Sequence, residues 1–81
     1  MNRDEVMSLV QKHLAEELEV DLDRISEGTR FKEDLDADSL DLYELVMELE
    51  DNYGITVSEE QAAGIRTVGD AVDFVVQHAP A

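Results

Sequence analysis

The sequence predicts an all-α protein, a small four-helix bundle with a short third helix and a long loop between the first two helices. Three observations support this fold class. Apolar residues recur at helical spacing, capping residues precede the expected helix starts, and no segment shows the alternation typical of a strand. A chain of 81 residues has room for one modest core, so residues 1–81 are expected to form a single domain.

The first helix is expected over roughly residues 3–18. The apolar residues that recur every four positions in it are Val6, Val10, Leu14 and Leu18. The following stretch, EVDLDRISEGTRFKEDLDA, mixes turn-forming residues with isolated apolar ones. We expect a long ordered loop that Ile25 and Phe31 anchor to the core.

The second helix is expected to begin after Asp38, which is a favourable N-cap, and to end at Gly54. Ser39 then lies in the first helical turn. The inner stripe of this helix is predicted to consist of Leu42, Leu45, Val46, Leu49 and Tyr53.

Two shorter helices complete the predicted bundle. Ser58 and Gln61 have the spacing of a capping box for a short helix that runs through Ala63 and stops at Gly64. The last helix is expected to start at Thr67. Its inward-facing residues are predicted to be Val68, Ala71, Val72 and Val75.

The charge balance limits the possible partners. The chain has 21 acidic and six basic residues and a formal net charge of −15. Such a surface repels nucleic acid and anionic lipid and attracts basic proteins, so neither nucleic-acid binding nor membrane insertion is expected. No signal-peptide pattern or apolar run of membrane-spanning length occurs, and we expect a cytoplasmic protein that acts as a monomer.

Ser39 lies in an unusually acidic stretch, DLDADSLDLYELVMELED. A catalytic serine needs a base such as histidine or lysine, and neither occurs in this stretch, so no catalytic residue and no enzymatic activity are expected. Ser39 is therefore either a residue that another enzyme modifies or simply a helix-start residue. A phosphate ester here would meet the free N–H groups of the helix N-terminus.

The aspartates before Ser39 partly match a calcium-binding loop. Asp34, Asp36 and Asp38 correspond to the first, third and fifth positions of an EF-hand. The glycine needed at the sixth position is Ser39, and the glutamate needed at the twelfth is Leu45. No specific metal site is expected, although weak and diffuse binding of divalent cations stays possible for so acidic a chain.

The second helix also carries apolar residues outside its inner stripe, namely Leu40, Tyr43 and Met47. They are spaced by three or four residues and are bordered by Asp41, Glu44, Glu48 and Asp51. Such a strip is either a docking surface for basic proteins or part of a larger core, and the pattern alone does not decide between them.

The stretch DLDADSLDLYELVMELE resembles the helix that carries the prosthetic group in acyl carrier proteins, whose signature centres on Asp-Ser-Leu. The resemblance extends over nearly the whole chain, from the first amphipathic helix to RTVGDAVDFV near its end. It implies that Ser39 receives 4′-phosphopantetheine from coenzyme A and that Asp38 helps to position this serine. The thiol of that arm would explain how a chain without cysteine carries thioesters.

The resemblance also assigns two groups of residues. The partner-docking residues it implies are Leu40, Asp41, Tyr43, Glu44, Met47, Glu48 and Asp51. The residues it implies for the acyl-chain pocket are Val46, Leu49, Val57, Ala62, Ile65 and Ala71. Three positions depart from the commoner family pattern: Asp36 replaces a glycine, Tyr43 a small aliphatic residue and Ser58 a proline.

The function implied is that of a discrete carrier of acyl thioesters for fatty acid biosynthesis. Its partners would be a phosphopantetheinyl transferase (holo-carrier synthase) and, through basic docking patches, malonyl transacylase, ketosynthase, ketoreductase, dehydratase and enoyl reductase. Polyketide or specialised lipid synthesis is the nearest alternative. An acidic protein-interaction adaptor or weak divalent-cation binder with an unmodified Ser39 is an alternative of a different class.

Overall fold

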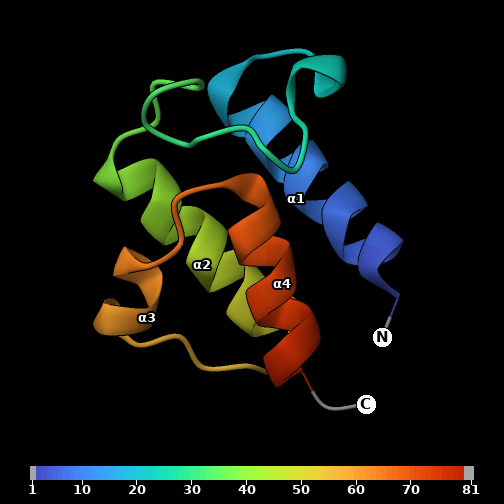
Figure 1. Cartoon of the computed structure of the whole chain (residues 1–81), viewed down its shortest axis with the longest axis vertical. Coiled ribbons are helices and arrows are strands. Elements are labelled where there is room, and N and C mark those ends of the chain that lie inside the picture. Colours follow the sequence, from blue (N-terminus) through green and yellow to red (C-terminus); the bar gives the residue numbers. More distant parts are fainter. Residues whose placement is uncertain (1, 80–81) are drawn as a thin grey trace.

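The helices follow the predicted order along the chain. The structure is a computed structural model that describes residues 2–79, so Met1, Pro80 and Ala81 lie outside the described residues. Within residues 2–79 the elements are α1 (Arg3–Leu18), a short 3-10 turn η1 (Leu22–Arg24), α2 (Ser39–Tyr53), α3 (Glu59–Ala63) and α4 (Val68–His78). The predicted four-helix arrangement with a short third helix is confirmed, and η1 is an addition within the long loop (Figure 1).

The core lies where the predicted apolar stripes meet. α1 packs mainly against α4 and also against α2, whereas α3 flanks α2 (Figure 1). The helix residues fully buried in this core include Val6, Val10, Leu14, Leu45, Leu49, Val68, Ala71, Val72 and Val75. Leu18, Leu42 and Tyr53, also predicted for the inner stripes, are half-buried at its edge. None of the helices in residues 2–79 has the length and apolarity needed to span a bilayer.

Reciprocal capping boxes start three of the helices. The Asp38 carboxylate accepts from the Asp41 N–H at 3.0 Å, and the Asp41 carboxylate accepts from the Asp38 N–H at 3.2 Å. The predicted box of Ser58 and Gln61 is present at α3, and Thr67 forms the equivalent box at α4. Each box satisfies two backbone donors that the helix itself cannot pair, which explains why the starts are readable from sequence.

The long loop is joined to the beginning of α4 by backbone hydrogen bonds. We call the paired segments 27–31 and 66–69 the loop–α4 seam. Its three bonds run from the N–H of Phe31 to Arg66 O, of Val68 to Thr29 O and of Gly69 to Glu27 O, at 3.1, 2.9 and 2.8 Å. The predicted anchoring is confirmed, because Ile25 and Phe31 are each only 2% exposed.

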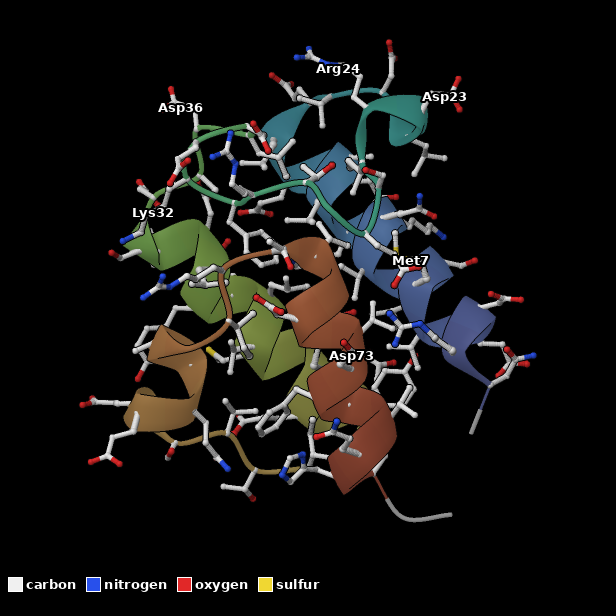
Figure 2. The ribbon with its side chains drawn as sticks, in the orientation of Figure 1. Met7, Asp23, Arg24, Lys32, Asp36 and Asp73 are labelled. Atoms are coloured by element: carbon white, nitrogen blue, oxygen red, sulfur yellow. The ribbon has the colours of Figure 1, made fainter. Side chains whose placement is uncertain are left out.

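Side chains reinforce this seam on both sides. The buried hydroxyl of Thr29 accepts from the Ser26 N–H at 2.9 Å and donates to Arg24 O at 3.3 Å. Arg3, at the start of α1, forms ion pairs with Glu27 of the loop and Asp73 of α4. Figure 2 shows Asp73 on the part of α4 that faces α1. Three separate stretches of chain are thereby held at one place.

Two acidic residues adopt the left-handed backbone conformation that favours glycine. Glu19 follows the end of α1 with φ 56°, and Asp36 lies in the loop before α2 with φ 54°. The side chain of Asp36 projects away from the molecule (Figure 2). Asp tolerates this region better than most residues, which explains why a residue other than glycine can stand here.

Replacing Gly69 by alanine tests the seam. A Cβ at Gly69 would lie 2.9 Å from the backbone oxygen of Glu27, so the paired segments of the seam must separate. We expect Gly69→Ala to lower the free energy of unfolding by about 1–3 kcal/mol, although alanine is the better helix former. Gly28→Ala is the matched control, because its Cβ meets nothing within 4 Å. Urea denaturation of both variants measures the difference, and equal stability would contradict the seam's importance.

Replacing Asp36 tests the backbone strain before α2. We expect Asp36→Gly to leave stability unchanged or raise it by up to about 1 kcal/mol, because glycine adopts positive φ freely. Asp36→Val should cost about 1–2 kcal/mol, since a β-branched side chain fits this region poorly. Thermal unfolding of the three proteins gives the order. If Asp36→Val is as stable as the wild type, the backbone at this position is not held at positive φ in solution.

Candidate functional site

Ser39 is the first residue of α2, and its side chain is exposed. It lies at the positive end of the helix dipole, where backbone N–H groups point out of the helix. The Asp38 carboxylate bonds to the Asp41 N–H and so fixes the turn that presents Ser39. The arrangement exposes a hydroxyl on a rigid helix start, which suits a residue that another molecule must reach.

The approach to Ser39 is held by the loop. The N–H of Ala37 donates to Phe31 O at 2.9 Å, and Ala37 is itself 5% exposed. Phe31 belongs to the loop–α4 seam, so the chain from the seam to the start of α2 is tied down at both ends. The serine is thus positioned by long-range contacts as well as by its own helix.

A cavity of about 270 Å³ opens beside Ser39, between α2 and α3. Its wall is mostly apolar and is formed by Leu42, Tyr43, Val46, Val57, Ala62 and Ala63. Its polar lining consists of Lys32, Ser39, Ser58 and Glu59. The cavity thus offers a mostly apolar space beside the serine.

A second cavity of about 620 Å³ adjoins the first and shares Lys32, Leu42, Ala62 and Ala63 with it. Of the residues expected to line an acyl-chain pocket, Val46, Val57 and Ala62 line the first cavity and Ile65 lines the second. Leu49 and Ala71 lie in the packed core and line neither cavity. The larger cavity also reaches Arg30 and Arg66, so its walls are more polar.

The outer face of α2 carries an exposed apolar strip. Leu40, Tyr43 and Met47 are 65%, 59% and 54% exposed, so the core does not absorb them. Exposed Glu48 and Asp51 and half-buried Asp41 and Glu44 border this strip. Large apolar side chains ringed by carboxylates form a surface suited to a partner with a basic rim and an apolar centre.

A carboxylate of α1 joins this face, and the sequence did not predict it. Glu17 lies beside Asp41 and Glu44, and one carboxylate oxygen from each lies within 4.8 Å of the others. A hydrogen bond with Glu17, followed by its charge, raises the pKa of Glu44 above the ordinary glutamate value. Nothing in the spacing of Glu17 marks this contact, because it depends on how α1 crosses α2.

The aspartates that partly match a calcium loop have separate roles. Asp34 accepts hydrogen bonds from the backbone and guanidinium of Arg30, at 2.8 Å from the backbone N–H. These bonds lower the pKa of Asp34 below its ordinary value. Asp38 caps α2, and Asp36 points outward (Figure 2). The carboxylates of Asp34 and Asp38 thus have different partners, and the outward-pointing carboxylate of Asp36 shares neither.

Comparison with known proteins agrees with this geometry. The family described as "Phosphopantetheine attachment site" matches residues 8–75. An acyl carrier protein of Lactobacillus acidophilus is 42% identical over 78 residues, which cover 96% of this chain and 98% of the relative. One of Rubrobacter xylanophilus is 46% identical over 78 residues, or 96% of each chain. A solved acyl carrier protein of Enterococcus faecalis superposes with a TM-score of 0.84 at 39% identity, covering 98% of this chain and 100% of that one.

These matches settle the class of protein and its prosthetic group. The matched family is defined by the site at which 4′-phosphopantetheine is attached, and the relatives are carriers rather than catalysts. The exposed serine at a helix start and the adjoining apolar cavity agree with a carrier role. This chain belongs to the acyl carrier protein family.

Proposed function

We propose that the chain is a discrete carrier of fatty acid biosynthesis, a single cytoplasmic domain over residues 1–81 with 4′-phosphopantetheine attached to Ser39. The observation that carries the proposal is the exposed hydroxyl of Ser39 at the start of α2, on the rim of the cavity between α2 and α3. Ser39 also falls within the segment that matches the phosphopantetheine attachment family.

The attachment step requires little from the carrier itself. The oxygen of the Ser39 hydroxyl forms a bond to the phosphorus next to pantetheine in coenzyme A. The pyrophosphate bond breaks, the nucleotide part leaves, and the serine proton passes to a base on the transferase. This chain contributes an accessible oxygen and, through Asp38 and Asp41, a rigid turn that presents it.

The carrier then works by tethering. When attached, phosphopantetheine supplies the thiol that this cysteine-free chain lacks, and acyl groups are held on it as thioesters. A tether raises the effective concentration of its cargo at each partner's active site. We propose that the cavity lined by Val46, Val57 and Ala62 shelters the acyl chain between partners, and that Ile65 extends this shelter into the adjoining cavity.

The proposed partners share a basic surface that meets the face of α2. They are the phosphopantetheinyl transferase and the transacylase, ketosynthase, ketoreductase, dehydratase and enoyl reductase of fatty acid synthesis. The support is the exposed strip of Leu40, Tyr43 and Met47 with its carboxylate border. Carboxylates at the rim steer association over long range, and the apolar strip supplies area that becomes buried on docking.

A test of the prosthetic group uses intact mass. Incubation with coenzyme A and a phosphopantetheinyl transferase is expected to add one phosphopantetheine to the wild type and none to Ser39→Ala. Ser58→Ala is the matched control, because Ser58 lines the same cavity and should leave modification at Ser39 intact. Modification that maps to another residue, or none with several active transferases, would overturn the attachment proposal and favour the adaptor alternative.

A test of the docking face reverses two of its charges. Glu44→Lys/Glu48→Lys is expected to slow malonyl transfer from its coenzyme A thioester to the loaded carrier by about tenfold or more at low salt, because attraction to a basic transacylase becomes repulsion. The loss should shrink as salt screens both proteins. Stability should change little, within about 0.5 kcal/mol per site, and a lysine at position 44 gains Glu17 as a counter-charge.

The control for this test is Glu16→Lys/Asp23→Lys. It makes the same change in net charge at exposed positions outside α2, and Asp23 lies at the η1 end of the molecule (Figure 2). Only a modest, salt-dependent slowing is expected, from the altered net charge alone. If the two double variants slow transfer equally, the face of α2 is no docking site and its carboxylates only keep the chain in solution.

A further inference from the structure

Among residues 2–79, Lys32 is the one basic residue that lines the cavity beside Ser39. The interval from residue 33 to residue 65 contains no Lys or Arg, so α2 and α3 carry no positive side chain of their own. Figure 2 shows Lys32 beside the N-terminal end of α2, to which it is brought by the loop rather than by the helix. Its side chain is thus the basic group among the residues that line this cavity.

The neighbouring arginines have other partners. Arg3 pairs with Glu27 and Asp73, and Arg30 pairs with Glu33 and Asp34. Within residues 2–79, Lys32 takes part in no ion pair, and its side chain is exposed. Arg30 and Arg66 line the larger adjoining cavity but not the one that contains Ser39.

Without Lys32, a phosphodiester on Ser39 would have carboxylates as its charged neighbours. It keeps one negative charge at neutral pH, and the carboxylates nearest to it in the chain are those of Asp38 and Asp41. Glu59 adds a further carboxylate to the lining of the cavity. The free N–H groups at the start of α2 offset part of this repulsion, because they form the positive end of the helix dipole.

We propose that Lys32 binds the phosphodiester of the arm attached to Ser39 and so directs the arm toward the cavity between α2 and α3. The inference rests on the proposed attachment at Ser39. Lys32 is a positioning residue: its flexible stem brings a point charge to the phosphate, and its seat in the shared lining sets the side on which the arm leaves the helix. An exposed pair of this kind is weak, so the arm remains free to leave for a partner.

The composition of the chain allows a direct test, because Lys12 and Lys32 are its only lysines. Both are accessible to a reagent, and Lys12 lies on α1, outside the lining of the cavity beside Ser39. The apo protein and the loaded protein, whose thiol is capped with iodoacetamide, are treated with acetic anhydride at low salt. The acetylation rate of each lysine is then followed by peptide mass spectrometry.

Loading is expected to slow acetylation of Lys32 about two- to fivefold relative to Lys12, which is the size of a single exposed ion pair. The slowing should disappear at high salt, which screens such pairs. An unchanged ratio of the two rates between apo and loaded protein overturns the role of Lys32. A loading-induced slowing of both lysines alike also overturns it, since that result reports a general change in the protein.

Substitutions provide a second readout on the arm itself. The phosphorus NMR shift and relaxation of the loaded variants are measured at low salt. Lys32→Gln should then give the values that wild type gives at high salt, where the ion pair is screened. Lys32→Arg and Lys12→Gln should give the values of wild type at low salt. Identical phosphorus signals for Lys32→Gln and wild type at low salt contradict the proposal. Because acetylation is measured on wild-type protein, poor loading of a variant does not leave the question open.

The intact mass separates this inference from the attachment proposal. Loaded protein must show one phosphopantetheine on Ser39 before either readout is interpreted. If no modification occurs at Ser39, the attachment proposal fails and the role of Lys32 fails with it. If Ser39 is modified and Lys32 is acetylated as fast as before, only the role of Lys32 fails.

Discussion

The backbone hydrogen bonds of the loop–α4 seam are the constraint on which the functional end of this molecule depends. Within residues 19–38, the loop between α1 and α2 has one short 3-10 turn and no other helix, and its buried residues are Ile25, Thr29, Phe31, Leu35 and Ala37. Pairing of segment 27–31 with segment 66–69 converts it into an ordered part of the core. The start of α2, the rim of the cavity and Lys32 all take their positions from that pairing.

The carboxylates of the chain divide into two groups with different physical roles. Those at helix starts and in the loop accept hydrogen bonds from backbone N–H groups or pair with arginines, as Asp38, Asp70 and Asp34 do. Such bonds stabilise the folded state, because they favour the charged form of each carboxylate and offset part of the repulsion between the carboxylates. Those on the outer face of α2 form no ion pair within residues 2–79, and Glu44 even lies against Glu17. Because no basic side chain in the described part of the chain neutralises these carboxylates, their charge remains available to attract a basic partner.

The local features of the fold were predictable and the long-range ones were not. Apolar spacing and capping residues follow local rules, so the helix bounds and core stripes agree with the sequence prediction. The seam, the pairing of Arg3 with both Glu27 and Asp73, and the contact of Glu17 with Glu44 join residues far apart in the chain. No local pattern encodes them. For the candidate site, the sequence placed Ser39 in the first turn of the second helix but left open whether Leu40, Tyr43 and Met47 join the core. It also gave no sign that Lys32 shares a cavity with the serine.

The short helix α3 has no fully buried residue, although it forms one wall of the cavity. Moving it outward exposes little apolar surface and leaves the contact between α1 and α4 intact, so the free-energy cost is far below that of global unfolding. A hinged movement of this wall is therefore the low-cost way to widen the proposed acyl-chain pocket. Under that proposal, acyl chains of different length would share one scaffold, in which the contact of α1 with α4 gives rigidity and the position of α3 sets the space available.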